Sequence, residues 1–231
     1  MKTKSILITG DRKGIGRFLS EKFLQRGWFV YGCSRSDTDL QHKMYKHFEL
    51  DVCDEKQVID MFNNIRRGDH KLFCVINNAG VASMNHILTT PKSTFQKLTD
   101  VNFIGTALCS REGVKLMLRQ RTGRIINFST VASPLNLSGE AVYAASKAAV
   151  ETFSRTLSDE VSKYNITVNI IGPSPAKTDL ISGVPNDKIM NLLQKLKVKR
   201  LCNYDDIVNV VDFFIDEKSS MVTGQTIYLG G

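Results

Sequence analysis

The sequence has 231 residues, of which 42% are hydrophobic and 23% charged, and its 31 Lys and Arg against 23 Asp and Glu give a formal net charge of +8. This composition predicts a globular chain with a full core and excludes an intrinsically disordered one, and no apolar run approaches the roughly 20 residues of a membrane span. The start, MKTKSILITG, has too short an apolar centre for a signal peptide, and five Cys without a CxxC pair argue against a disulfide framework, so we expect a cytoplasmic protein with reduced thiols.

Strands and helices are expected to alternate along the whole chain. Short β-branched or aromatic runs predict strands at Ser5–Ile8, Phe29–Gly32, Phe48–Leu50, Leu72–Asn77, Arg124–Ser129, Thr167–Ile171 and Thr226–Leu229. Apolar residues recur at helical spacing between them, and before the last strand Asp205 and Asp206 suit the positive end of a helix dipole. The alternation predicts a single α/β domain over residues 1–231, a Rossmann-type doubly wound parallel sheet of about seven strands with helices on both faces.

The first strand is followed by TGDRKGIG, in which Thr9, Gly10, Gly14 and Gly16 open a helix. Glycines allow a tight turn and let backbone N–H groups approach a pyrophosphate at the helix N-terminus. Such a turn also serves simply to reverse a chain. Its place between a strand and an amphipathic helix favours dinucleotide binding.

The end of the second predicted strand reads YGCSRS, with Ser34 and Arg35 and no carboxylate before Asp37. An NAD site usually has an acid here to accept hydrogen bonds from the adenosine ribose. Arg12 and Lys13 in the glycine loop add positive charge, which a 2'-phosphate would favour. We therefore expect NADPH rather than NADH, although these cations also fit an ordinary solvated surface.

Tyr143 and Lys147 lie four residues apart in AVYAASKAAVETFSRTLSDEV, a stretch with the apolar spacing of an amphipathic helix. The spacing places both side chains on one face. A Tyr with a snorkelling Lys at the edge of a core would explain an isolated pair of this kind.

Several separated motifs together resemble those of the short-chain dehydrogenase/reductase family over essentially the full length. They are TGDRKGIG, LDVCD with Asp51 and Val52, NNAG over Asn77–Gly80, DVNFIG with Asn102, YAASK with Tyr143 and Lys147, and GPSPAKT with Pro173–Thr178. The resemblance implies that Tyr143 donates a proton to a substrate carbonyl oxygen while the nicotinamide delivers hydride to the carbon. It also implies that Lys147 binds the nicotinamide ribose and that Asn102 holds a helix kink and a water. Since a nearby cation favours an ionised phenol, we expect Lys147 to lower the pKa of Tyr143.

The sequence departs from the family pattern at two positions. The family's serine, thirteen residues before the tyrosine, is here Thr130; the adjacent Ser129 should point to the opposite face of its strand. Ser174 stands where the family commonly has Gly, which would carry strain only if the backbone there needs a positive φ. The loss of a bulkier residue at Ala176 is expected to loosen nicotinamide packing.

Together these arguments predict a catalytic and a cofactor-binding set of residues. The catalytic set is Asn102, Thr130, Tyr143 and Lys147. The cofactor set is Thr9, Gly10, Arg12, Lys13, Gly14, Ile15, Gly16, Ser34, Arg35, Asp51, Val52, Asn78, Ala79, Gly80, Tyr143, Lys147, Pro173, Ser174, Ala176 and Thr178.

The expected function is NADPH-dependent reduction of a ketone or aldehyde to an alcohol. A carrier-bound 3-oxoacyl thioester leads among the substrates, because the sequence is similar to bacterial 3-oxoacyl-acyl-carrier-protein reductases and its basic patches suit an acidic carrier. The residues also permit a nucleotide-linked sugar or another polar carbonyl as substrate. A non-catalytic NADPH-binding sensor or scaffold is a further alternative.

Other partners are not expected. No helix carries a basic stripe with interleaved aromatics, which argues against nucleic acid. His42, His47, His70 and His86 follow no metal spacing and are expected at surface or loop positions, so no metal is predicted. The resemblance to the short-chain dehydrogenase/reductase family implies a homotetramer or homodimer. The segments expected to form its interfaces are Asn102–Gln120, the Tyr143 helix and the C-terminal strand.

Overall fold

The computed structural model describes residues 4–176 and 186–231, and for residues 186–188 only the backbone. Its strands are β1 (Lys4–Thr9), β2 (Phe29–Ser34), β3 (Tyr45–Glu49), β4 (Lys71–Asn77), β5 (Gly123–Phe128), β6 (Ile166–Pro173) and β7 (Thr226–Leu229). They form one seven-stranded sheet in the order β3-β2-β1-β4-β5-β6-β7, and every pair is parallel. The predicted doubly wound sheet is confirmed, since the strand order reverses direction between β1 and β4.

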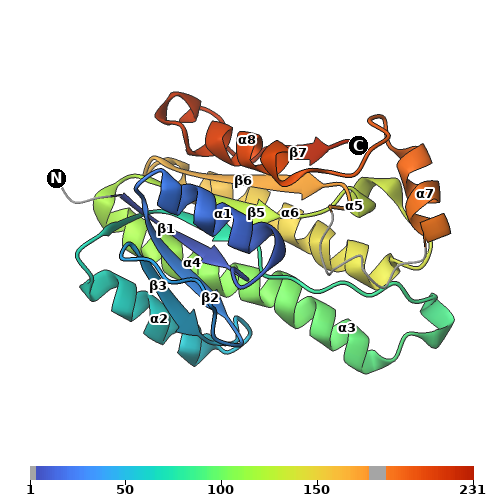
Figure 1. Ribbon diagram of the computed structural model, residues 1–231, viewed down its shortest axis with the longest axis horizontal. Helices are drawn as coiled ribbons and strands as arrows, with labels where there is room; N and C mark the ends of the chain where they lie inside the picture. Colours follow the sequence, from blue (N-terminus) through green and yellow to red (C-terminus); the bar gives the residue numbers. More distant parts are fainter. Residues whose placement is uncertain (1–3, 177–185) are drawn as a thin grey trace.

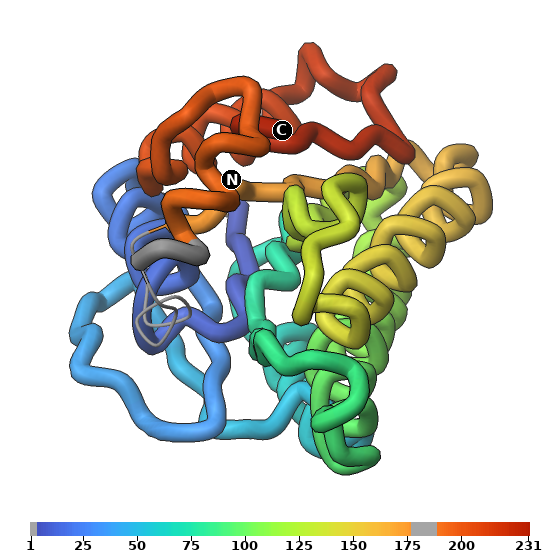
Figure 2. The backbone as a smooth tube through the Cα atoms, turned by 90° about the vertical axis from the view of Figure 1, so that its right-hand side faces the viewer, coloured from blue at the N-terminus to red at the C-terminus, as the bar shows by residue number. Residues whose placement is uncertain are grey.

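Helices cover both faces of this sheet (Figure 1). They are α1 (Gly14–Gln25), α2 (Glu55–Arg67), α3 (Lys92–Thr99), α4 (Gly105–Gln120), α5 (Ala132–Leu135), α6 (Ala141–Ser162), α7 (Asn186–Lys195) and α8 (Tyr204–Ile215). Helices α1 and α8 pack on one face, and α2, α4 and α6 on the other. Figure 2 shows α4 and α6 running side by side.

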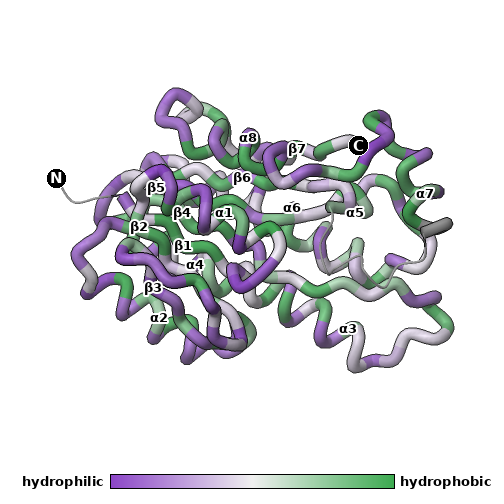
Figure 3. The backbone as a smooth tube through the Cα atoms, viewed as in Figure 1, coloured by the Kyte–Doolittle hydropathy of each residue, from purple (hydrophilic) through white to green (hydrophobic). Residues whose placement is uncertain are grey.

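Two apolar cores result from the alternation of strand side chains. Ile6 and Ile8 point toward α1 and α8, whereas Leu7 points toward α2 and α4. Strands buried on both faces need nearly continuous apolar runs, which Figure 3 shows as hydrophobic colour along the centre of the sheet. The described residues include no helix long and apolar enough to cross a bilayer.

The third strand differs from its prediction. It was expected at Phe48–Leu50 but runs over Tyr45–Glu49, pairing with β2 from Val30 opposite Tyr45. As the edge strand it is only partly buried, so its sequence YKHFE mixes polar and aromatic residues and lacks the apolar run that marks the inner strands. The acidic start predicted for the last helix is confirmed, because Asp205 and Asp206 lie in the first turn of α8.

Candidate active site

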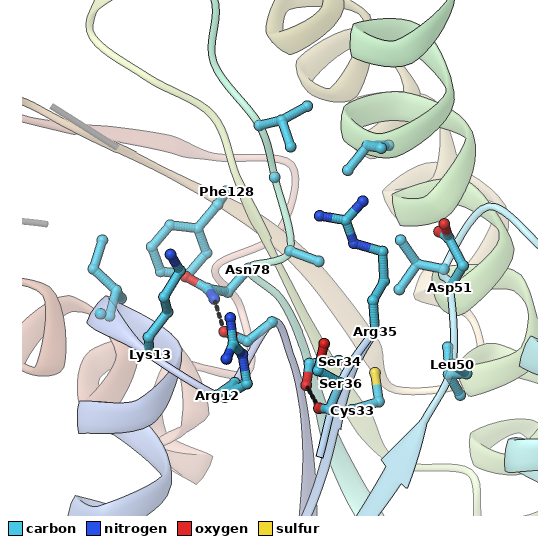
Figure 4. A pocket seen from close by; sticks show the side chains of 18 of the residues that line it. Arg12, Lys13, Cys33, Ser34, Arg35, Ser36, Leu50, Asp51, Asn78 and Phe128 are labelled. Atoms are coloured by element: carbon cyan, nitrogen blue, oxygen red, sulfur yellow. Dashed lines mark hydrogen bonds between the residues drawn. The ribbon is translucent and has the colours of Figure 1, made fainter. Parts of the chain in front are cut away.

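A cleft opens at the carboxyl edge of the sheet, where β1, β2, β4, β5 and β6 all end. This is the edge at which parallel α/β sheets bind ligands. Figure 4 shows part of its lining. The structure brings the following predicted residues together around the cleft: Gly10, Arg12, Lys13, Gly14, Ile15, Ser34, Arg35, Asp51, Val52, Asn78, Ala79, Gly80, Tyr143, Lys147 and Pro173.

The glycine loop is held in place by the segment that follows β4. The Thr9 hydroxyl accepts hydrogen bonds from the backbone N–H groups of Asn78 (3.1 Å) and Ala79 (3.0 Å), and the Asn78 side chain donates to the carbonyl of Thr9. Gly10 adopts a φ of 70°, and a Cβ on Gly16 would lie 2.4 Å from the Gly10 carbonyl oxygen. Only glycine fits this cradle, which opens α1 toward the cleft and suits a pyrophosphate.

Positive charge gathers at one end of the cleft. Arg12 and Lys13 follow β1, and Arg35 follows β2, across from them in Figure 4. Within residues 4–176 and 186–231, neither Arg12 nor Arg35 forms an ion pair. Asp51 lies on the same wall, but its side chain accepts a hydrogen bond from the backbone of Cys53. Unpaired guanidinium groups in a cleft can bind an anion such as phosphate.

The Tyr143 phenol lies beside the hydroxyl group of Thr130, which follows the end of β5. The Thr130 side chain is hydrogen-bonded to the Tyr143 phenol and also accepts from the backbone N–H of Ala132 at 3.2 Å. Ser129 lines the cleft, but its hydroxyl donates to the buried carboxylate of Glu151. The choice of Thr130 as the catalytic hydroxyl stays a prediction.

Lys147 lies one helical turn from Tyr143 and is almost fully buried. Its ammonium group donates to the carbonyl oxygen of Phe128 at 2.8 Å, and burial lowers its pKa to about 8. Burial raises the pKa of Tyr143 to about 12, while the Thr130 hydrogen bond opposes the rise and the Glu140 carboxylate adds to it. The prediction that Lys147 lowers the pKa of this phenol is wrong for this geometry, because the ammonium is directed to the Phe128 carbonyl.

Asn102 occupies a π-helical turn, η2 (Asp100–Ile104), between α3 and α4. Its buried side-chain amide accepts from the Val81 backbone N–H and donates to the Val81 carbonyl, both at 2.9 Å. The same amide donates to the Ser146 hydroxyl at 3.0 Å, and Ser146 donates to the Tyr143 carbonyl. Asn102 thus joins the loop after β4 to the first turn of α6, and the π-helical turn lies where the helix kink was expected.

Other predicted residues lie behind the cleft or outside the described chain. Four predicted residues lie behind those that line the cleft and contact them: Thr9, Gly16, Asn102 and Thr130. Ser174 and Ala176 are buried; Ser174 does not have a positive φ, so its replacement of Gly carries no backbone strain. Thr178 lies outside the described residues.

Sequence reasoning missed several groups at this site. Phe128 supplies the carbonyl that holds Lys147, and Ser36 lines the charged end of the cleft. Their only sequence signal is their position next to a strand end. His47 was expected in a loop or on the surface, which is wrong: it lies within β3, with its side chain 9% exposed, and contacts Ser34 and Ser36.

The arrangement has the parts that a dinucleotide and a carbonyl compound require. A glycine cradle and a cationic end suit the phosphates, and the same cleft is lined by a phenol and an ammonium group, with the Thr130 hydroxyl behind the phenol. A phenol whose pKa is about 12 remains protonated at neutral pH, so it can act as a proton donor.

Comparison with known proteins gives concordant matches. A family model described as Enoyl-(Acyl carrier protein) reductase matches residues 10–231. The 3-oxoacyl-acyl-carrier-protein reductase of Buchnera aphidicola is 30% identical over 99% of this chain and 96% of its own length. Among solved structures, ElxO with NADP bound covers 99% of this chain and 97% of its own at 24% identity, with a TM-score of 0.89. The 4-hydroxyisoleucine dehydrogenase complexed with NADH has the same identity and TM-score, and the match covers 99% of this chain and 98% of that one.

Proposed function

Because the chain belongs to the short-chain dehydrogenase/reductase family and is an NAD(P)-dependent oxidoreductase acting on C=O and CH–OH groups, we propose that it reduces a ketone or aldehyde with NADPH, using Tyr143 as proton donor. The observation that carries the proposal is the geometry of one cleft, which is lined by the Tyr143 phenol, by Lys147 and by the glycine loop. The whole chain is proposed to work as one catalytic domain.

In this mechanism, bound NADPH supplies a hydride for the carbonyl carbon. The Tyr143 hydroxyl holds the carbonyl oxygen by a hydrogen bond and gives it a proton as the carbonyl becomes an alcohol, while Thr130 orients the phenol from behind the cleft lining. Lys147, held by the Phe128 carbonyl, would bind the ribose hydroxyls of the nicotinamide nucleotide, as the family resemblance implies. Asn102 and Ser146 fix the first turn of α6 and so position the phenol.

The preference for NADPH rests on this chain's own residues, since an NADP-bound and an NADH-bound structure match its fold equally well. Arg12 and Arg35 offer unpaired positive charge, and no carboxylate precedes Asp37 at the end of β2. We expect the dissociation constant of NADPH to be lower than that of NADH, and Arg35→Ala to weaken NADPH binding more than NADH binding.

The proposed substrate is a 3-oxoacyl thioester on an acidic carrier protein. The named Buchnera relative supports this choice, as does the net charge of +8. A polar carbonyl such as a nucleotide-linked sugar is the alternative substrate. We also propose that the chain works as a homotetramer or homodimer through α4, α6 and β7, which sedimentation would test.

Replacing Tyr143 with Phe tests the proposal directly. With a β-ketoester as substrate, the rate at which NADPH absorbance is lost should fall by about 10²- to 10⁴-fold, which is the usual contribution of a positioned proton donor. NADPH affinity should change far less than the rate, because the other cofactor residues are intact. Tyr164→Phe, two residues beyond the end of α6, is the matched control and should keep full activity. Tight NADPH binding without turnover of any carbonyl by the unaltered protein would instead support the sensor or scaffold alternative.

A further inference from the structure

A buried carboxylate lies inside the glycine loop, behind the cationic end of the cleft. The side chain of Asp11 is 0% exposed and rests on β2, where a Cβ on Gly32 would come within 1.6 Å of the Asp11 carboxylate. Tyr45 on β3 donates a hydrogen bond to its Oδ2. Its Oδ1 has no hydrogen bond but lies 3.4 Å from Nδ1 of His47.

The hydrogen bonds around His47 favour a proton on both ring nitrogens. The single Tyr45 hydroxyl hydrogen goes to Asp11, so His47 Nδ1, 3.0 Å away, meets a lone pair of the phenol oxygen. Burial and Asp11 raise the pKa of Tyr45, which therefore keeps this hydrogen. His47 Nε2 lies 3.2 Å from the Ser36 carbonyl oxygen, which is purely an acceptor. Only the imidazolium form satisfies both contacts.

The charged groups around the ring agree with this assignment. Burial by itself lowers the pKa of His47, but the Asp11 carboxylate 3.4 Å away, the Ser36 carbonyl and the charge of Asp37 raise it above its ordinary value. Arg17 on α1 acts on Tyr45 and is itself paired with Glu21 and Asp39. The Asp11 charge is thus the main partner of the ring.

His47 reaches the cleft through Ser34. The Ser34 hydroxyl donates to the Ser36 carbonyl at 2.6 Å and lies 3.2 Å from His47 Nε2. Both serines line the cleft beside Arg35. When Nε2 carries a proton it can satisfy the Ser36 carbonyl alone, and the Ser34 hydroxyl is free to turn to an anion. When Nε2 carries no proton, it accepts a hydrogen bond from the Ser34 hydroxyl, so this hydroxyl no longer donates into the cleft.

We propose that His47 is a positioning residue for cofactor selection: its protonated ring, held by Asp11 and Tyr45, frees Ser34 to donate to the 2'-phosphate of NADPH. Loss of the proton also leaves the Asp11 charge uncompensated beside a site for phosphate. The discrimination between NADPH and NADH therefore weakens as the pH rises. This inference rests on the proposed NADPH preference.

Binding titrations of both nucleotides test the inference without any turnover. The ratio of the NADH to the NADPH dissociation constant should fall about three- to tenfold between about pH 6.5 and about pH 8.5, because one proton is linked to 2'-phosphate binding. This range lies above the second phosphate pKa of about 6, so the nucleotide itself contributes little. Titration of Lys147 affects both cofactors and cancels in the ratio.

His47→Gln removes the titrating group and should keep the ratio constant within about twofold over the same range. His42→Gln, an exposed histidine ahead of β3, is the matched control and should behave as the unaltered protein. The same pH dependence in His47→Gln as in the unaltered protein would overturn the inference alone. NADPH binding no tighter than NADH at any pH would overturn the proposed cofactor preference and the inference with it.

A measurement on the unaltered protein removes any dependence on the folding of the variant. By reciprocity, NADPH should raise the pKa of His47, followed by NMR of the ring, and NADH should raise it less. Equal effects of the two nucleotides would contradict the role of the 2'-phosphate.

Discussion

Replacing Lys147 with Met should stabilise the fold at neutral pH while it removes activity. The ammonium group is buried and, among the residues that the structure describes, has one hydrogen bond, to the Phe128 carbonyl. Burial lowers its pKa from the ordinary 10.5 to about 8, so the folded protein holds this charge at a cost. Met has nearly the same length and carries no charge to desolvate.

The magnitude follows from the pKa values. The difference 10.5 − 8 = 2.5 corresponds to about 3 kcal/mol at about 1.4 kcal/mol per pH unit. Removing the donor leaves the Phe128 carbonyl unsatisfied, which costs about 1–2 kcal/mol. The net gain in the free energy of unfolding is therefore about 1–2 kcal/mol at pH 7, or about 2–8 °C in melting temperature for a chain of this size.

The sign of the pH dependence gives a second readout. Between about pH 8 and 10.5 the unfolded chain binds the Lys147 proton and the folded chain does not, so the stability of the unaltered protein gains a rising contribution with pH. The Met variant lacks that contribution, and its advantage should disappear toward pH 10.

Urea unfolding followed by the fluorescence of Trp28, the single tryptophan, measures both effects. Lys56→Met, an exposed residue near the start of α2, is the control and should show neither. A Lys147→Met protein that is less stable at pH 7 by more than about 1 kcal/mol would refute the reasoning, since an unfavourable buried charge predicts the opposite sign.

Two further predictions concern Thr130 and Asp206. Thr130→Val removes the hydroxyl that bonds Tyr143 and should lower kcat/KM about 10- to 100-fold, whereas Thr130→Ser should keep most of it; equal losses in both would assign the effect to packing. Asp206→Ala removes the capping box of α8 and the pair with Arg200, costing about 1 kcal/mol in urea unfolding at pH 7. Because Arg200 lowers the pKa of Asp206 to about 2, this contribution is present above about pH 4 and fades as the pH falls toward 2. A stability difference that does not change over this range would contradict the charge argument.

The inner strands could be located from the sequence because burial on both faces leaves long apolar runs, as in Lys71–Asn77. The edge strand β3 could not be bounded in this way. Its Tyr45 and His47 are polar groups buried by contacts with Asp11, thirty-four and thirty-six positions away, and no local pattern encodes such a contact.

The candidate site was predictable where a motif names both residue and spacing, as for Tyr143 and Lys147. The choice between Ser129 and Thr130 followed from strand alternation, which is a local rule. The electrostatics was not predictable, because the pKa of Tyr143 depends on how deeply the phenol is buried and on where the Lys147 ammonium points. The Asp11 network needed the three-dimensional arrangement of β1, β2 and β3.

The wide turn at Asp100–Ile104 bears on how the chain tolerates insertions and deletions. A π-helical turn holds one residue more than an α-helical turn, so removing one residue there would restore an ordinary α-helix and leave α4 close to its present orientation relative to α3. Gly105, where a Cβ would collide with Val52, and the fully buried Cys109 would then keep their places. A single-codon gap in this turn should therefore disturb the packing of α4 less than the same gap inside α4, where it would rotate every later residue of the helix by about 100°.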